Sequence, residues 1–331
     1  MTMRSFGLLL MITLSAYGQN PATPSASGSQ GPDASHSIHP HGDYVTVNGS
    51  KLWYESEGSG PPLLLIAGGP GSSHSYLHPH FSPLAKSYRV VYFDPYGTGK
   101  SDVAHDPHEY SFKRDVENVE GLRNALHLGQ INVLGHSYGG FVAQAYALRF
   151  PSSVQKLVLV DTQWGAEMMK AFGEYRRDEL HSLFPDAWER VMKAHSQGFH
   201  TCSKEYDDAW GETGDFGLTL LFYDVTQARK LMETAEPTNH EVNCTILGDD
   251  PEFVLAADIA KLDFRPELKN LQMPTLIVAG RYDRILPPRY QEQFHKYAPQ
   301  AQFMMFEKSG HFPFIEEPEE FTRVVSEFLS K

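Results

Sequence analysis

Short apolar segments recur along most of the chain and alternate with stretches of helical periodicity. The apolar segments are PLLLIA (62–67), YRVVYFD (88–94), INVLG (131–135), KLVLVD (156–161), PTLIVAG (274–280) and AQFMMFE (301–307). Strands that are apolar along their whole length are buried on both faces, and intervening helices supply the cover. The sequence therefore predicts an α/β fold whose mostly parallel sheet carries helices on both faces.

A hairpin is expected before the first of these segments. Residues 44–47 and 51–56 form two short strand-like runs, and Asn48 and Gly49 stand near the turn between them. Asn-Gly is the strongest short signal for a two-residue hairpin turn, because both residues tolerate a positive φ. We therefore expect two antiparallel strands at the start of the folded core.

The first 18 residues have the pattern of a secretory signal peptide. Arg4 is followed by the apolar run FGLLLMITLSA and by small residues where a cut before Gln19 requires them. A buried N-terminal helix is the alternative. Residues 19–42 are rich in Pro, Ser, Gly and Ala, so we expect a disordered linker there. These features predict a secreted or periplasmic protein without stable membrane insertion after signal cleavage.

The long interval between Asp161 and Pro274 interrupts the alternation of strands and helices. It contains no clear core strand but several short helical patterns, so we expect a helical cap at residues 164–261. The α/β core would then comprise residues 43–163 and 262–331. Residues 164–260 hold 19 Asp and Glu against 8 Lys and Arg. A solvated surface explains this imbalance, and a substrate with a free amine would also suit it.

Charge and cysteine content narrow the range of partners. The chain has 28 Lys and Arg against 41 Asp and Glu, giving a formal charge of −13. Nucleic acids and anionic membranes are therefore poor partners, whereas a small neutral or cationic ligand is compatible. In an oxidising compartment Cys202 and Cys244 can form a disulfide, with two buried thiols as the alternative. The sequence does not constrain the oligomeric state.

The segment GHSYG at residues 135–139 is a G-x-S-x-G motif that follows an apolar strand and precedes a predicted helix. This context matches the sharp strand-to-helix turn that exposes a nucleophilic serine, and small residues are needed where the chain approaches its neighbours. Ser137 is therefore the candidate nucleophile. His136 next to it is assigned to packing, since neighbouring side chains in such a turn point apart.

A serine nucleophile needs a histidine base, and the histidine needs an acid that fixes its tautomer. Asp283 and His311 each follow a predicted strand, in the chain order Ser, Asp, His of an α/β-hydrolase. Loops at the carboxyl ends of parallel strands meet at one edge of the sheet. Asp161 also ends a strand and is the rival acid, but a capping or turn role suits it better.

The glycine-rich segment AGGPG (67–71) follows the first apolar segment, where an α/β-hydrolase provides one donor of its oxyanion hole. The second donor is the N–H of the residue after the nucleophile, so we expect Gly69 and Tyr138 to form the hole. A phosphate-binding loop is excluded at YGTGKS (96–101), because the P-loop pattern needs a glycine where Asp94 stands.

Taken together, GGPG, FDPYGTGKSD, GHSYGG, GRYD and SGH resemble the prolyl aminopeptidase, or proline iminopeptidase, branch of the α/β-hydrolases. The resemblance runs from about Asp43 to the C-terminus, with Ala67 where the family usually has histidine. It implies the same triad and oxyanion hole, release of N-terminal residues from peptides, and cap carboxylates that bind the substrate amine. The candidates for these carboxylates are Glu174, Glu205, Glu212 and Glu233.

The sequence thus predicts a serine hydrolase that acts on a small peptide or small acyl substrate without a cofactor or metal. An aminopeptidase of prolyl type is the leading hypothesis, and an esterase or lactonase is the alternative within the same class. A non-catalytic binding module of this fold is the alternative from another class. Epoxide hydrolases and haloalkane dehalogenases are disfavoured, because they need a carboxylate where Ser137 stands.

Overall fold

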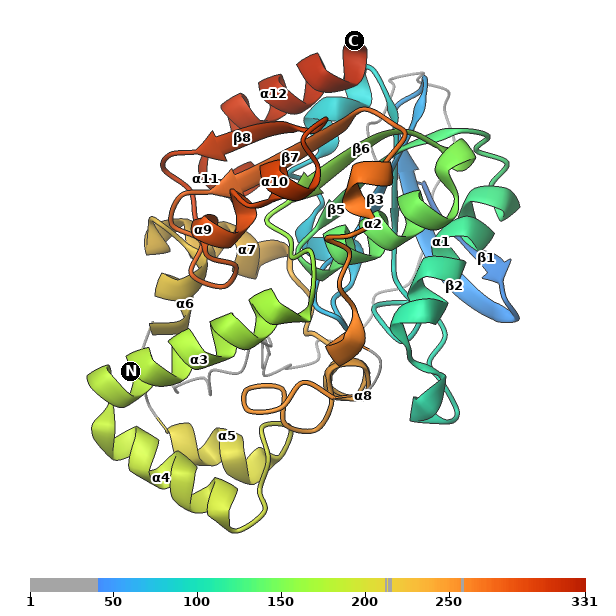
Figure 1. The fold of residues 1–331 in the computed structure, drawn as a ribbon. Coiled ribbons are helices and arrows are strands. Elements are labelled where there is room, and N and C mark those ends of the chain that lie inside the picture. The colour runs from blue at the N-terminus through green and yellow to red at the C-terminus, as the bar shows by residue number, and fades with distance from the viewer. Residues whose placement is uncertain (1–40, 212, 214–215, 257–258) are drawn as a thin grey trace, which may run out of the picture.

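A single twisted sheet organises the described part of the chain (Figure 1). The computed structural model describes residues 41–331, apart from 212, 214–215 and 257–258. Eight strands in this part follow the order β1-β2-β4-β3-β5-β6-β7-β8. Their bounds are β1 His41–Val47, β2 Ser50–Glu57, β3 Pro62–Ile66, β4 Arg89–Phe93, β5 Ile131–His136, β6 Val154–Val160, β7 Thr275–Gly280 and β8 Gln302–Phe306.

In this order, β4 and all the strands after it, including β3, run parallel to one another. By contrast, β2 pairs antiparallel with both β1 and β4. The first two strands form the expected hairpin, with Val47 opposite Ser50. The turn residues Asn48 and Gly49 have φ values of 50° and 84°, which suit a tight hairpin turn. The predicted mostly parallel α/β sheet with an antiparallel start is confirmed.

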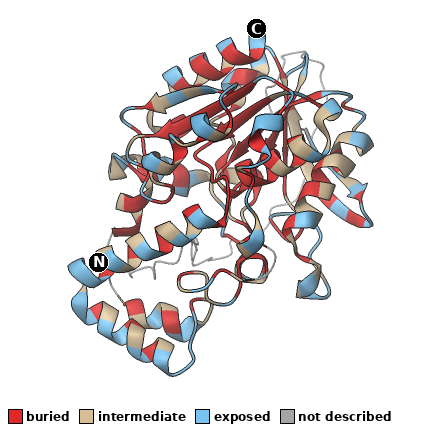
Figure 2. Cartoon of the chain, viewed as in Figure 1, coloured by how far each residue is buried: buried red, intermediate tan, exposed pale blue. Residues whose placement is uncertain are grey.

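Successive side chains of the central strands pack alternately into two separate apolar cores, one on each face of the sheet. Leu64 and Ile66 point to one core, and Leu63 and Leu65 point to the other. The first core is covered by α1 (Phe112–Ala125) and α2 (Tyr138–Arg149), and the second by α12 (Pro318–Ser330). Figure 2 shows the central strands buried and the outer faces of these helices exposed. Both faces of the sheet are therefore covered by helices, as expected.

Short helices fill the interval between β6 and β7. They are α3 Ala166–Leu183, α4 Pro185–Ser196, α5 Lys204–Trp210, α6 Phe216–Leu221, α7 Ala228–Thr234 and α8 His240–Leu247. In Figure 1, α4 and α5 lie at the end of this region that is farthest from the sheet. The remaining helices α9 Pro288–Gln291, α10 Phe294–Tyr297 and α11 Pro313–Glu316 belong to the C-terminal part of the core. No helix of the described residues is long and apolar enough to cross a membrane.

The start of the folded core differs slightly from the expectation. β1 begins at His41, so two residues that we assigned to the linker, His41 and Gly42, belong to the first strand. They pair with Ser56 and Glu55 of β2, and this backbone ladder orders a segment whose composition carries no strand signal. The predicted signal peptide and the rest of the predicted linker lie outside the described residues.

Candidate active site

Ser137 occupies a sharp turn between β5 and α2. Its backbone has φ 55° and ψ −126°, a conformation that residues other than glycine rarely adopt. The turn is fixed by hydrogen bonds from the Ser137 N–H to the Val160 carbonyl (2.9 Å) and from Thr162 Oγ1 to the Ser137 carbonyl (2.7 Å). A Cβ on Gly139 would lie 2.2 Å from the Ile66 carbonyl oxygen. The strained turn thus needs the small residue that the motif supplies.

Asp283 and His311 meet beside this turn. Asp283 follows β7, His311 follows β8, and His311 Nδ1 lies 2.8 Å from Asp283 Oδ2. Asp283 Oδ1 accepts the backbone N–H groups of Ile285 (2.8 Å) and Leu286 (2.9 Å), so the carboxylate is held from both sides. Because Nδ1 donates its proton to Asp283, Nε2 of His311 is left as the nitrogen that can accept a proton.

A second buried carboxyl group adjoins this pair. Asp161 Oδ1 accepts the Gly280 N–H (2.7 Å), and Gln291 Nε2 lies 3.2 Å from Asp161 and 3.4 Å from Asp283. Burial and the charge of Asp283 raise the pKa of Asp161 well above its usual range. The structure pairs His311 with Asp283 rather than with this rival acid.

The loop after β3 presents backbone N–H groups next to Ser137. The Gly68 N–H donates to the Tyr76 hydroxyl at 2.7 Å and is therefore occupied. Within the described residues, the N–H groups of Gly69 and Tyr138 have no hydrogen-bond acceptor. Tyr138 is the first residue of α2, so its N–H also carries the positive end of the helix dipole. These two free donors are the pair that the sequence singles out for an oxyanion hole.

A buried hydrogen-bond chain links this loop to His311. The Tyr76 hydroxyl accepts from Gly68 and donates to His136 Nδ1 (2.8 Å), and His136 Nε2 donates to the His311 carbonyl (2.8 Å). Burial and the neighbouring His311 lower the pKa of His136, so that its ring is neutral and every donor has one acceptor. The assignment of His136 to packing is therefore incomplete, because this ring joins the loop to the backbone of His311.

A small cavity of about 20 Å³ adjoins the oxyanion loop. Most of its walls are apolar; the lining residues include Ala67, Gly68, Gly71, Tyr138, Val142 and Val242. Asp115 of α1 is the one carboxyl group among the residues that line it. The Tyr138 hydroxyl donates to Asp115 Oδ2 at 2.7 Å, and burial raises the pKa of Asp115 to about 7. Nothing local in the sequence distinguishes Asp115 from an ordinary helix residue.

The cap glutamates that the family resemblance suggests lie on exposed surfaces. Glu174 is exposed on α3, Glu205 is exposed on α5, and Glu233 is exposed on α7, where it pairs with Arg229. Glu212 lies outside the described residues. In Figure 1, α5, the helix that carries Glu205, lies far from the sheet.

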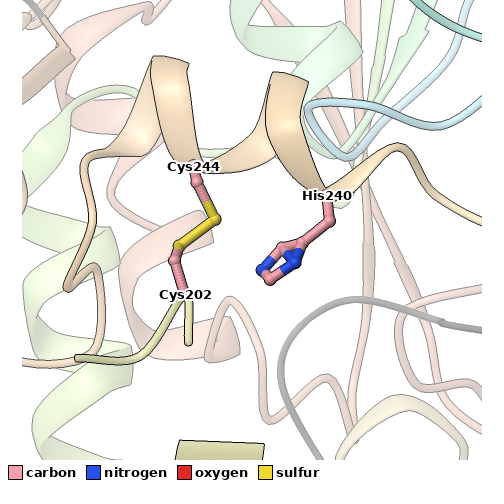
Figure 3. Close-up of side chains that lie close together, drawn as sticks. All are labelled: Cys202, His240 and Cys244. Atoms are coloured by element: carbon pink, nitrogen blue, oxygen red, sulfur yellow. A yellow bond between two sulfur atoms is a disulfide. The ribbon is translucent and has the colours of Figure 1, made fainter. Parts of the chain in front are cut away.

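Cys202 and Cys244 are joined by a disulfide (Figure 3). His240 lies on the same helix as Cys244, next to this bond. The two sulfur atoms and one ring nitrogen lie within 4.8 Å of one another, as do ligand-type atoms of Asp161, Asp283 and His311. In the first group the disulfide consumes both thiolates. In the second, Asp283 and His311 are hydrogen-bonded to each other. Neither group presents a free set of metal ligands.

Comparisons with known proteins show the family of the chain. A family model described as the α/β hydrolase fold covers residues 61–200 and 244–318. A proline iminopeptidase of Heyndrickxia coagulans is 30% identical over 290 residues, covering 87% of this chain and 98% of the relative. The crystal structure of proline iminopeptidase from Mycobacterium smegmatis aligns with a TM-score of 0.70 and 21% identity, covering 88% of this chain and 98% of that one. A thermophilic esterase from Thermogutta terrifontis aligns with a TM-score of 0.59 and 25% identity over 88% of this chain and 98% of its own.

Proposed function

This chain belongs to the α/β-hydrolase fold family, in the branch of the proline iminopeptidases, and is a serine hydrolase; we propose that it releases N-terminal residues, chiefly proline, from small peptides. The observation that carries the proposal is that three parts follow the carboxyl ends of parallel strands in one sheet. These are the strained Ser137 turn, the hydrogen-bonded pair of Asp283 and His311, and the free N–H groups of the oxyanion loop.

In this proposal Ser137 Oγ attacks the scissile carbonyl carbon while His311 Nε2 accepts its proton. Asp283 holds the imidazole in the required tautomer and stabilises the imidazolium ion that forms. The N–H groups of Gly69 and Tyr138 stabilise the tetrahedral oxyanion. His311 then gives the proton to the leaving amine. In the second half of the reaction a water molecule attacks the acyl-enzyme, His311 accepts a proton from this water, and Ser137 leaves with that proton.

An aminopeptidase must also recognise a free amino or imino group. The small cavity beside the oxyanion loop has mostly apolar walls and holds the carboxyl group of Asp115. A cationic imino group beside Asp115 would form a charge-assisted hydrogen bond and favour the ionised carboxylate. We therefore assign Asp115, rather than Glu174, Glu205 or Glu233, as the group that binds the substrate nitrogen.

A panel of substrates tests this function. It comprises proline and other aminoacyl anilides, the same compounds with a blocked nitrogen, and short-chain nitrophenyl esters. We expect turnover of the free proline anilide, at least a tenfold loss on blocking the nitrogen, and loss of turnover in Ser137→Ala. Equal rates for free and blocked anilides would reject the aminopeptidase, and full activity of Ser137→Ala would reject the triad.

The second candidate function is an esterase or lactonase that acts on small acyl groups. The likeness to the Thermogutta terrifontis esterase favours it, because that structure shares the fold over nearly its whole length. Fast ester turnover without any anilide turnover would select this function. Absence of turnover together with absence of labelling by a fluorophosphonate would select a non-catalytic binding module.

We also propose that the chain is exported to the periplasm or the extracellular space. The N-terminal pattern of residues 1–18 supports this, and a disulfide between Cys202 and Cys244 suits an oxidising compartment. N-terminal sequencing of the protein recovered outside the cytoplasm should begin at Gln19. A mature chain that still starts at Met1 would contradict the proposal.

A further inference from the structure

The oxyanion loop is bound by the cap as well as by the core. The Asn239 N–H donates to the Gly71 carbonyl at 2.8 Å, and Asn243 Nδ2 donates to the Pro70 carbonyl at 2.9 Å. The hydroxyl groups of Ser72 and Thr238 lie 3.2 Å apart and share a hydrogen bond. Three consecutive loop residues are thus held by residues some 170 positions later in the chain.

The backbones of the loop and of the cap touch at Gly71. A Cβ at this position would lie 2.5 Å from the Asn239 carbonyl oxygen, and Gly71 has a φ of 98°. Only glycine combines this conformation with such a close approach. The contact is therefore a close backbone contact rather than an adaptable side-chain contact.

Helix α8 is fixed in place on both sides of this contact. Asn239 caps its N-terminus by accepting the Glu241 N–H at 3.0 Å, and Asn239 Nδ2 donates to the Gly97 carbonyl of the core at 2.7 Å. One turn later Asn243 is buried, with an exposed fraction of 3%. Further along the helix, Cys244 is joined to Cys202 (Figure 3). The donors that hold the loop are therefore themselves held rigidly.

We propose that helix α8 sets the geometry of the oxyanion hole and that Asn243 is the positioning residue that does so. This inference rests on the proposed function, because it assigns a role to the Gly69 N–H. The Pro70 carbonyl that Asn243 binds lies two peptide groups after the one that carries the Gly69 N–H, so this hydrogen bond holds the loop close to the donor. Preorganised donors stabilise an oxyanion only when their geometry is held closely.

The test compares Asn243→Ala with Asn132→Ala. Asn132 is a matched control because it is also buried, at 2% exposed, and its Nδ2 also donates to a proline carbonyl, that of Pro62, at 3.2 Å. Asn132 lies on β5 and does not touch the oxyanion loop. We expect the two variants to lose similar thermal stability, because each leaves one buried carbonyl without its donor.

The two variants should differ in catalysis. Removal of a whole oxyanion donor costs about 10²- to 10³-fold in rate, and a misplaced donor costs less. We therefore expect about a 10- to 100-fold lower kcat for Asn243→Ala with KM within threefold of wild type, and less than a twofold change in kcat for Asn132→Ala. An unchanged kcat, or a rise in KM alone, would overturn the inference.

The rate of fluorophosphonate labelling provides a second readout that does not depend on the natural substrate, since the phosphoryl oxygen of this probe occupies the oxyanion hole. Slower labelling of Asn243→Ala than of Asn132→Ala supports the inference. Equal labelling of both variants and wild type contradicts it while leaving the hydrolase assignment intact. Failure of wild type to label would instead reject the proposed function. Asn243→Ser, which retains a hydroxyl donor, serves if the alanine variant does not fold.

Discussion

At the scale of single residues, the direction of the hydrogen-bond chain from Gly68 to His311 follows from which groups can only donate and which can only accept. Gly68 N–H can only donate and the His311 carbonyl can only accept, so the chain between them has a single direction. Tyr76 and His136 each donate once and accept once within this chain. The Tyr76 hydroxyl therefore keeps the Gly68 N–H away from the substrate and leaves Gly69 as the free donor.

Replacing Tyr76 by phenylalanine tests this chain. The variant leaves the Gly68 N–H and His136 Nδ1 without partners, and we expect a loss of about 1–3 kcal/mol in the free energy of unfolding together with a lower kcat. Tyr146→Phe is the control, because Tyr146 is equally buried and its hydroxyl bonds Glu120 away from the site. Urea denaturation and kcat should show that both variants lose stability but only Tyr76→Phe loses activity.

Asp115→Asn tests the assignment of the group that binds the substrate nitrogen. We expect KM for proline anilide to rise about 10- to 100-fold, which corresponds to a lost charge-assisted hydrogen bond of roughly 1.5–3 kcal/mol. KM for a neutral nitrophenyl ester should stay within threefold. Asp186→Asn on the exposed surface of α4 is the control. A similar KM change for both substrates would show that Asp115 only supports the pocket.

Asp115→Asn should also change how the free energy of unfolding depends on pH. The pKa of Asp115 is about 7 in the folded chain and about 3.8 in the unfolded chain, so the folded state binds the proton more tightly. Wild type should therefore lose stability as the pH rises from about 4 to 7. Asp115→Asn lacks this loss, and urea denaturation at pH 5 and pH 8 should show a smaller difference than in wild type.

At the scale of elements, the parts of the fold that the sequence predicts are those with local signals. The strand at residues 131–136 is buried throughout and mostly apolar. Asn48 with Gly49 marks the turn of the β1–β2 hairpin without reference to the rest of the chain. The pairing of Asp283 with His311 was predictable for the same reason, because both residues follow strands. Asn243 was not predictable, because the Pro70 carbonyl that gives it a role is 173 residues away.

The disulfide between Cys202 and Cys244 links two cap segments that are 42 residues apart in sequence. Closing a loop of this length stabilises the chain by about 4 kcal/mol in the chain-entropy model. Because the bond anchors α8, we expect Cys202→Ser with Cys244→Ser to lower both the melting temperature and kcat. Thiol titration of the denatured, unreduced wild type should find no free thiol, and two thiols would contradict the bond.

At the scale of the whole molecule, stability depends on buried charged groups that are not among the candidate catalytic residues. His74 lies between two carboxylates, with Nδ1 2.6 Å from Asp94 and Nε2 3.4 Å from Glu55. Burial lowers the pKa of His74, but its hydrogen bonds to Asp94 and Glu55 outweigh this effect and raise the pKa to about 9. The hydrogen bond from His74 lowers the pKa of Glu55 to about 2. The cluster is therefore charged across the neutral range.

The pH dependence of unfolding follows from the signs of these shifts. The contribution of His74 is fully present below its unfolded pKa of 6.5 and is lost as the pH rises through about 9, an effect of about 3 kcal/mol. That of Glu55 is present above 4.5 and is lost as the pH falls through about 2. These two groups therefore stabilise the fold most between about pH 4.5 and 6.5.

His74→Gln should remove the contribution of His74 to the decline in the free energy of unfolding at alkaline pH. The glutamine cannot bind a proton, so the decline in the free energy of unfolding between pH 6.5 and 9 should shrink by up to about 3 kcal/mol relative to wild type. The variant should also be less stable at pH 6, because Asp94 and Glu55 then lose the cation that lies between them. His105→Gln, at an exposed position, is the control and should leave the curve unchanged. Urea denaturation at half-unit pH intervals measures the difference, and an alkaline decline of equal size in all three proteins would show that His74 does not hold its proton in the folded state.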